Sequence, residues 1–192
     1  MKTAWLLHGT GGSNKDYFWF ADTKQYLESE GYEVWWPLLP NTDKPELVET
    51  RNAIEDDKEH FYWNEDTVII AHSSACPLIL HLLQYFKTPV KQVILVAGFY
   101  KSIDDEGFSE LMLQKEEYDW EAIKEAAKEI ILINSDNDPW GCDDKQARPV
   151  AIKLEAPLIL ATGQGHMGSR TYNQPYKVFP LLKRLLRLSD EP

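Results

Sequence analysis

An apolar run near the middle of the chain leads directly into two serines. Residues 68–76 read Val-Ile-Ile-Ala-His-Ser-Ser-Ala-Cys, so a buried strand is expected to pass straight into a helix. This pattern resembles Gly-x-Ser-x-Gly, a strained strand-to-helix turn that exposes a serine hydroxyl as a nucleophile. In this register Ser73 is the candidate nucleophile, and Ala71 and Ala75 stand where glycines are usual. The alternative is that Ser73 or Ser74 only caps the helix.

Two later loops supply a base and an acid for such a serine. Residues 134–140 read Asn-Ser-Asp-Asn-Asp-Pro-Trp, and residues 162–168 read Thr-Gly-Gln-Gly-His-Met-Gly. The chain order is therefore serine, aspartate, histidine, as in the α/β-hydrolases. A base must accept the serine proton, and a carboxylate must orient that base. We take His166 as the base and favour Asp138 as the acid because Pro139 fixes its turn; Asp136 is the alternative.

A glycine-rich loop follows the first expected strand. Residues 7–13 read Leu-His-Gly-Thr-Gly-Gly-Ser. In hydrolases a loop at this place donates one backbone N–H to the oxyanion hole, and the residue after the nucleophile donates the other. We expect Thr10 as the first donor, with Gly11 as its alternative, and Ser74 as the second. The loop lacks the glycine spacing and the Gly-Lys-Ser/Thr ending of phosphate-binding loops.

Short apolar runs alternate with helix-length segments along the chain, which predicts a doubly wound parallel sheet with helices on both faces. The expected strands are residues 4–7, 33–36, 68–71, 93–96, 130–133 and 158–161. The expected helices are residues 14–30, 74–86, 118–127, 145–154 and 176–188, with a surface helix inside 42–60. Ligands bind beyond the carboxyl ends of such strands, where all the loops described above begin.

Composition limits the classes of partner. The 192 residues include 20 Lys and Arg against 31 Asp and Glu, a formal net charge of −11, which argues against nucleic acid and anionic membranes. The two cysteines have no zinc-ligand spacing and form no disulfide framework, so neither a metal nor another cofactor is expected. With no signal peptide or membrane span evident, we expect a cytoplasmic protein. The chain reads as one domain over 1–192, with a short cap-like segment at about 101–117.

With these motifs the sequence resembles the family of small serine hydrolases related to retinoblastoma-binding protein nine and bacterial YdeN. The matching segments span most of the chain: residues 9–13, 37–40, 69–75, 120–124, 135–139 and 165–166. The resemblance implies a minimal α/β-hydrolase fold with six parallel strands in the order 2-1-3-4-5-6. It also implies a triad of Ser73, Asp138 and His166. The family's usual turn reads Gly-His-Ser-Ser-Gly, whereas this chain has alanine at both glycine positions.

The expected reaction is cleavage of a small carboxylic ester, thioester or amide through an acyl-enzyme on Ser73. Trp140, just past the acid, is a candidate for lining the acyl or leaving-group pocket, together with Gly11. Two alternatives stay open. In the first, the chain is a binding protein on a hydrolase scaffold with a weak or inactive site. In the second, it is an acyltransferase in which an alcohol replaces water.

Overall fold

A six-stranded parallel sheet forms the centre of the computed structural model, which describes residues 1–13, 17–104 and 106–186. Its strands are β1 (Thr3–Leu7), β2 (Glu33–Trp35), β3 (Val68–His72), β4 (Gln92–Val96), β5 (Ile130–Asn134) and β6 (Leu158–Leu160). All five neighbouring pairs are parallel, and the order is β2-β1-β3-β4-β5-β6. The predicted fold class and strand order are therefore confirmed, and the strand bounds differ from the expected ones by one residue at most.

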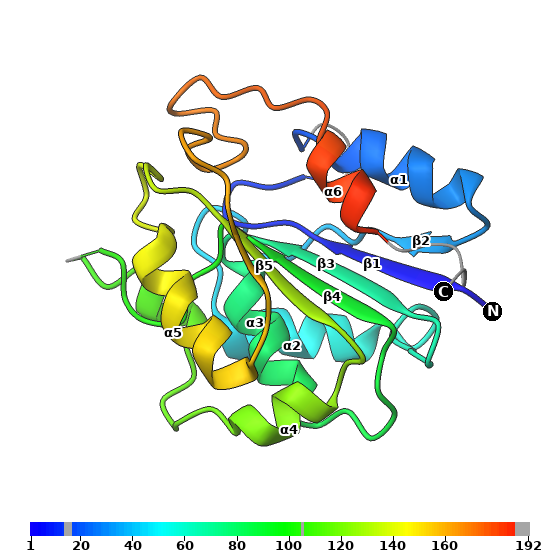
Figure 1. Ribbon diagram of the computed structural model, residues 1–192. Helices are drawn as coiled ribbons and strands as arrows, with labels where there is room; N and C mark the ends of the chain where they lie inside the picture. The colour runs from blue at the N-terminus through cyan, green and yellow to red at the C-terminus, as the bar shows by residue number, and fades with distance from the viewer. Residues whose placement is uncertain (14–16, 105, 187–192) are drawn as a thin grey trace.

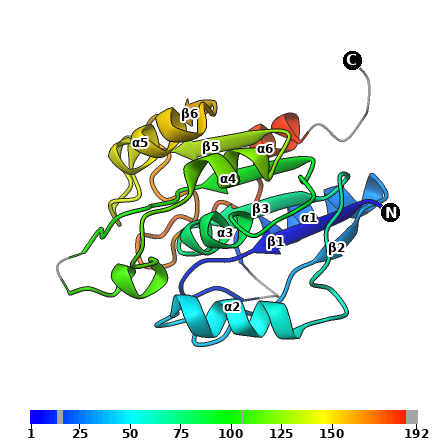
Figure 2. The same cartoon turned by 90° about the horizontal axis from the view of Figure 1, so that it is seen from below.

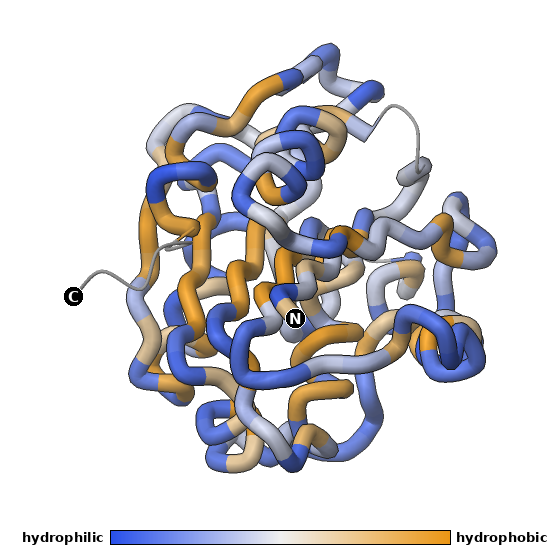
Figure 3. The backbone as a smooth tube through the Cα atoms, turned by 90° about the vertical axis from the view of Figure 1, so that its right-hand side faces the viewer, coloured by the Kyte–Doolittle hydropathy of each residue, from blue (hydrophilic) through white to orange (hydrophobic). Residues whose placement is uncertain are grey.

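The four inner strands are buried along their whole length. Apart from one polar residue at an end of each strand (Thr3, His72, Gln92 and Asn134), their residues are Val, Ile, Leu, Ala and Trp on successive positions. This suits strands covered on both faces. Figure 3 shows these strands as an apolar band through the middle of the molecule. The register pairs Leu7 with Ala71 and His72 with Val96, so adjacent strands end at nearly the same level. Every loop that leaves a carboxyl end consequently starts from one edge of the sheet.

Helices cover both faces of the sheet (Figures 1 and 2). One face carries α1 and α6, and the other carries α2, α3, α4 and α5, as parallel crossovers require. Their bounds are α1 (Phe20–Ser29), α2 (Leu47–Asp56), α3 (Ala75–Leu83), α4 (Trp120–Glu125), α5 (Asp144–Leu154) and α6 (Pro180–Leu185). A short 3-10 helix, η1 (Ser109–Met112), lies within the segment between β4 and α4.

The helices expected over 74–86 and 118–127 are shorter by a few residues at their ends, as α3 and α4. Two other expected helices begin well after their expected first residue, for identifiable reasons. The helix expected over 14–30 begins at Phe20, because Phe18 has a φ of 49°, which an α-helix cannot contain. Residues 14–16 of that expected helix lie outside the described residues. The helix expected over 176–188 begins at Pro180, where proline suits the first turn. Val178 precedes the helix and is 56% exposed, and residues 187–188 lie outside the described part.

Within the described ranges, no helix combines the length and the apolar character needed to cross a bilayer.

Candidate active site

Ser73 occupies the sharp turn between β3 and α3. Its φ of 56° lies in the left-handed region, which costs a non-glycine residue roughly 1–2 kcal/mol. The surrounding chain holds it there: the Ser73 N–H donates to the Val96 carbonyl at 2.9 Å, and the Ser73 carbonyl accepts from the Cys76 N–H at 2.9 Å. Ser74 begins α3 without a side-chain capping bond, so helix capping does not explain the serine pair. A strained serine at a strand-to-helix turn is the geometry of a nucleophile elbow.

The two alanines fit this turn. Ala71 and Ala75 are fully buried, and neither has a positive φ, so neither position needs the conformational freedom of glycine. The crowded position is Gly9, on the neighbouring loop. A Cβ there would lie 2.5 Å from the Ser73 Cβ and 2.9 Å from the His72 carbonyl oxygen. The close approach of loop and elbow therefore depends on Gly9.

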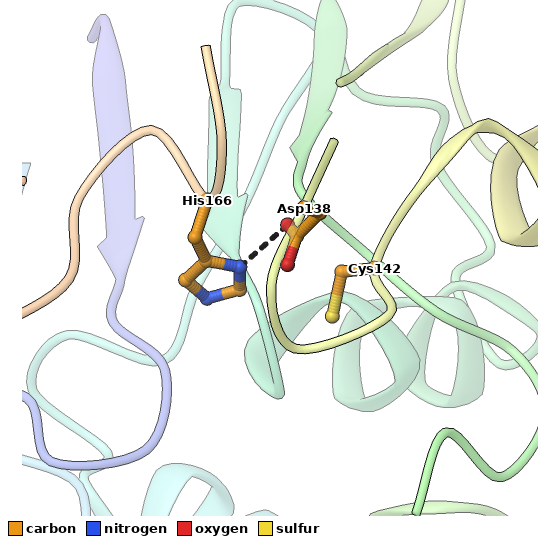
Figure 4. A group of neighbouring side chains, drawn as sticks. All are labelled: Asp138, Cys142 and His166. Atoms are coloured by element: carbon orange, nitrogen blue, oxygen red, sulfur yellow. Dashed lines mark hydrogen bonds and ion pairs between the residues drawn. The ribbon is translucent and has the colours of Figure 1, made fainter. Parts of the chain in front are cut away.

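Asp138 and His166 meet across the loops that follow β5 and β6 (Figure 4). The His166 Nδ1 and the Asp138 Oδ2 lie 2.7 Å apart, and both side chains are buried. The other carboxylate oxygen of Asp138 accepts from the Trp140 N–H at 2.8 Å. Because the carboxylate faces Nδ1, the Nε2 atom is left to face away from Asp138, as a general base for a serine requires.

Asp136 has a different partner. Its Oδ1 accepts from the Gly163 N–H at 2.8 Å, which ties the β5 and β6 loops together. Asn137 adds a parallel tie by accepting from the Gly165 N–H at 2.8 Å. The structure thus brings Asp138, and not Asp136, to the histidine.

A buried chain of hydrogen bonds through His72, at the end of β3, connects the loops that follow β1 and β6. The His72 Nε2 lies 2.9 Å from the His166 carbonyl oxygen, so this nitrogen carries the hydrogen. The His72 Nδ1 then accepts from the Tyr17 hydroxyl at 2.9 Å, and the Tyr17 oxygen accepts from the Gly9 N–H at 3.2 Å. Complete burial holds the pKa of His72 well below its usual value, which keeps the ring neutral.

The glycine-rich loop and the elbow each offer one candidate backbone N–H for the oxyanion hole, those of Thr10 and Ser74. Among the described residues, the N–H groups of Thr10 and Ser74 donate no hydrogen bond to the protein. The Gly11 N–H, in contrast, donates to the Thr42 carbonyl at 2.6 Å. The Thr10 hydroxyl donates to the Ser74 Oγ at 3.1 Å, which joins the loop to the start of α3. Gly11, the alternative donor, is therefore already engaged, whereas Thr10 and Ser74 are available.

His8 fixes the start of this loop. Its Nδ1 donates to the Gly9 carbonyl at 2.9 Å, and its Nε2 accepts from the Leu39 N–H at 3.0 Å. Burial lowers the pKa of His8, so the ring stays neutral and keeps both bonds. Sequence reasoning missed the roles of His8, Tyr17 and His72, since their partners lie in loops that meet only in the folded chain.

A cavity of about 600 Å³ opens over these groups. Its walls include Ser73, Ser74, Thr10, Gly11 and His166, so the predicted site residues other than Asp138 share one cavity. Trp140 also lines it, with 43% of its surface exposed. In the described part of the chain no hydrogen bond joins Ser73 to His166; such contacts are often loose before substrate binds.

The segment after β4 forms another wall of the cavity. Its lining residues are mainly apolar or aromatic and include Ile103, Phe108 and Met112. Phe99, at the start of this connection, and Phe18 line the cavity as well. Charged residues stand among them: Asp43, Lys44, Asp104, Glu106 and Arg170. The cavity therefore offers apolar contact next to the nucleophile and a charged perimeter.

The comparison with protein families decides the wider assignment. The family model described as "Serine hydrolase" matches residues 4–186. The chain belongs to the serine hydrolase family. This confirms the resemblance seen in the sequence, and the matched range contains every loop of the site.

Individual proteins are similar to this chain in sequence or in structure. The Bacillus subtilis protein YdeN is 28% identical over 170 residues, covering 86% of this chain and 85% of YdeN. The serine hydrolase RBBP9 of Rattus norvegicus is 25% identical over 176 residues, covering 90% and 91% of the two chains. The crystal structure of the B. subtilis ydeN gene product matches with a TM-score of 0.85 at 24% identity, covering 97% of each chain. The crystal structure of esterase PE8 shares the fold, with a TM-score of 0.59 at 15% identity, covering 88% of this chain and 86% of its own.

Proposed function

We propose that this serine hydrolase cleaves small carboxylic esters, thioesters or amides through a triad of Ser73, His166 and Asp138. The observation that carries the proposal is the 2.7 Å contact between His166 Nδ1 and Asp138, with Ser73 on the wall of the same cavity. A positioned carboxylate holds the imidazole in the tautomer whose Nε2 can accept a proton. The strained φ of Ser73 directs its hydroxyl away from the backbone of strand and helix and toward the cavity.

The reaction proceeds in two halves. The Ser73 Oγ attacks the carbonyl carbon while His166 Nε2 takes the hydroxyl proton, which gives a tetrahedral oxyanion. The N–H groups of Thr10 and Ser74 stabilise that oxyanion. Removal of one such donor costs about 3–4 kcal/mol in a studied protease. His166 then gives the proton to the leaving group, and the acyl group stays on Ser73. Water, activated by His166, releases the acid in the second half.

The cavity supports a small substrate. A volume of about 600 Å³ falls within the range of roughly 300–1,000 Å³ typical for small-molecule sites. Segment 101–117 acts as a cap in this proposal, because Ile103, Phe108 and Met112 line the same cavity as Ser73. No cofactor takes part in the proposed steps.

Hydrolysis of a series of short-chain p-nitrophenyl esters, thioesters and amides tests the proposal. We expect Ser73→Ala to reduce turnover of every accepted substrate to the background rate. Ser74→Ala is the matched control, since it keeps the backbone N–H and the adjacent Ser73 and loses only the hydroxyl that accepts from Thr10; it should retain most of the activity. Full activity in folded Ser73→Ala would refute the proposal.

A further inference from the structure

Cys142 lies beside the acid and the histidine of the proposed triad. It follows Asp138 by four residues in the turn after β5 and is completely buried. Figure 4 shows its sulfur next to the Asp138 carboxylate and the His166 ring. The proposed hydrolysis gives this thiol no role, although its sulfur is a soft ligand atom within 4.8 Å of a carboxylate oxygen and a ring nitrogen.

Three possible metal ligands meet at this place. The sulfur of Cys142, a carboxylate oxygen of Asp138 and a ring nitrogen of His166 all lie within 4.8 Å of one another. Zinc binds such atoms at about 2.0–2.3 Å, so three atoms at this spacing need only small side-chain shifts to share one ion. The set of one thiolate, one imidazole and one carboxylate is a donor combination that zinc accepts.

We propose that this cluster is an inhibitory site for Zn²⁺ or another thiophilic divalent cation such as Cd²⁺. Charge balance favours the bound ion, because one carboxylate and one thiolate neutralise its two positive charges in a buried place. Cys142 and His166 both line the main cavity, which gives the ion a path from solvent and leaves its fourth position open to water.

Binding rearranges protons without any redox change. The Cys142 thiol releases its proton to solvent as the metal–sulfur bond forms. The His166 proton leaves Nδ1, where the metal binds, and the ring regains a proton at Nε2. His166 then stays neutral but in the wrong tautomer. With Nε2 protonated, it can no longer accept the proton of Ser73, so the metal blocks acylation while it leaves the nucleophile in place.

Thiolate-to-metal charge-transfer absorption of Cd²⁺ tests the binding directly. The readout is specific for sulfur, which matters because a chain with a net charge of −11 also attracts cations to its surface. We expect a saturable band in the wild-type protein and in Ser73→Ala. Cys142→Ser, which is close to isosteric, should lose the band and bind Cd²⁺ at the cluster more than about tenfold more weakly, since even outer-shell changes commonly cost that much.

The second cysteine provides a matched control. Cys76 is also buried, but its thiol donates to the carbonyls of Ala71 and Val96 and it lies outside the cluster. Cys76→Ala should therefore keep the band. Circular dichroism verifies that each variant is folded. A band that survives in folded Cys142→Ser, or no saturable band in the wild type, would overturn the proposal.

Inhibition rests on the proposed function, whereas binding does not. Zn²⁺ should slow fluorophosphonate labelling of wild-type Ser73 reversibly, with full recovery on chelation, and should slow labelling of Cys142→Ser far less. Equal slowing of both proteins would overturn the inhibitory role. If the metal binds in Ser73→Ala but the wild type never reacts with the probe, the proposed hydrolase activity fails and the metal site stands.

Discussion

The imidazole of His72 donates a hydrogen bond from Nε2 to the main-chain carbonyl oxygen of His166, at 2.9 Å. His72 belongs to the end of β3 and immediately precedes the proposed nucleophile, and His166 lies 94 positions later in the loop after β6. The bond therefore ties the main chain of the proposed base to the strand end that carries the proposed nucleophile. Tyr17 extends the chain to Gly9, so the glycine-rich loop is tied to the same anchor.

Removal of this anchor should slow the chemical step. We expect His72→Phe to lower kcat by about 10–100-fold with little change in KM, because small displacements of catalytic groups cost rate at that scale. Tyr17→Phe should act in the same direction, since it leaves His72 Nδ1 without its donor. Steady-state kinetics on a short ester measure both values. His60→Asn, at a residue that does not line the cavity, is the control; wild-type kcat in folded His72→Phe would contradict the anchor.

Buried neutral histidines should make the fold sensitive to mild acid. Burial lowers the pKa of His8 and of His72, so the unfolded chain binds more protons than the folded one below about pH 6.5. The free energy of unfolding should then fall as the pH drops from 7 to 5, by up to about 1.4 kcal/mol per pH unit for each histidine. Urea denaturation at several pH values measures this slope.

A pair of variants separates these histidines from the other titrating groups. His72→Phe should flatten the slope between pH 7 and 5, whatever its effect on absolute stability. His60→Asn should steepen it, because Asp57 raises the pKa of His60 and protonation of that residue favours the folded state. A slope that is identical in His72→Phe and the wild type would rule out this source of acid sensitivity.

The two aspartates of the β5 loop should differ sharply in their effect on rate. Asp138→Asn removes the carboxylate that orients His166 and should reduce kcat by as much as about 10⁴-fold, the loss seen for the equivalent change in a serine protease. Asp136→Asn alters only the contact with Gly163 and should leave kcat close to that of the wild type. Single-turnover acylation rates provide the comparison. Equal losses in both variants would show that loop integrity, and not the Asp138 carboxylate, limits the rate.

Gly9 should be intolerant of a methyl group. An alanine Cβ would come within 2.5 Å of the Ser73 Cβ, so Gly9→Ala must push the elbow and the oxyanion loop apart. We expect a large loss of activity and a cost of about 1–3 kcal/mol in stability. Gly163→Ala is the control: its Cβ would meet open space, and its φ of 73° costs roughly 1–2 kcal/mol without touching the site. Thermal melts and ester turnover distinguish the two effects.

Much of this architecture can be predicted from the sequence because the signals are local. Continuous apolar runs such as residues 93–96 mark inner strands, and the chain order of Ser73, Asp138 and His166 follows from three loops that each come after such a run. The choice between Asp138 and Asp136 depends on which carboxylate faces the histidine. Pro139 and the family resemblance favoured Asp138, which is the aspartate that contacts His166 in the structure.

Other features depend on contacts between distant segments and have no local signal. Tyr17 and His72 are 55 positions apart, and only the folded loops bring them together. Cys142 stands in no ligand motif in the sequence, whereas in the structure the turn after β5 places its sulfur within 4.8 Å of a ring nitrogen of His166. The expected start of α1 at residue 14 is wrong for a related reason. Phe18 has a positive φ in the folded chain, which helix propensity does not predict.

Reaction with a fluorophosphonate probe, followed by mass-spectrometric mapping of the modified peptide, tests the central claim most directly. The reagent needs an activated serine but no knowledge of the substrate. We predict rapid formation of one adduct on Ser73 in the wild type and in Ser74→Ala, no adduct in Ser73→Ala, and strongly slowed labelling in His166→Ala. Absence of an adduct on folded wild-type protein, or an adduct on another serine, would contradict the account and favour a binding role for the scaffold.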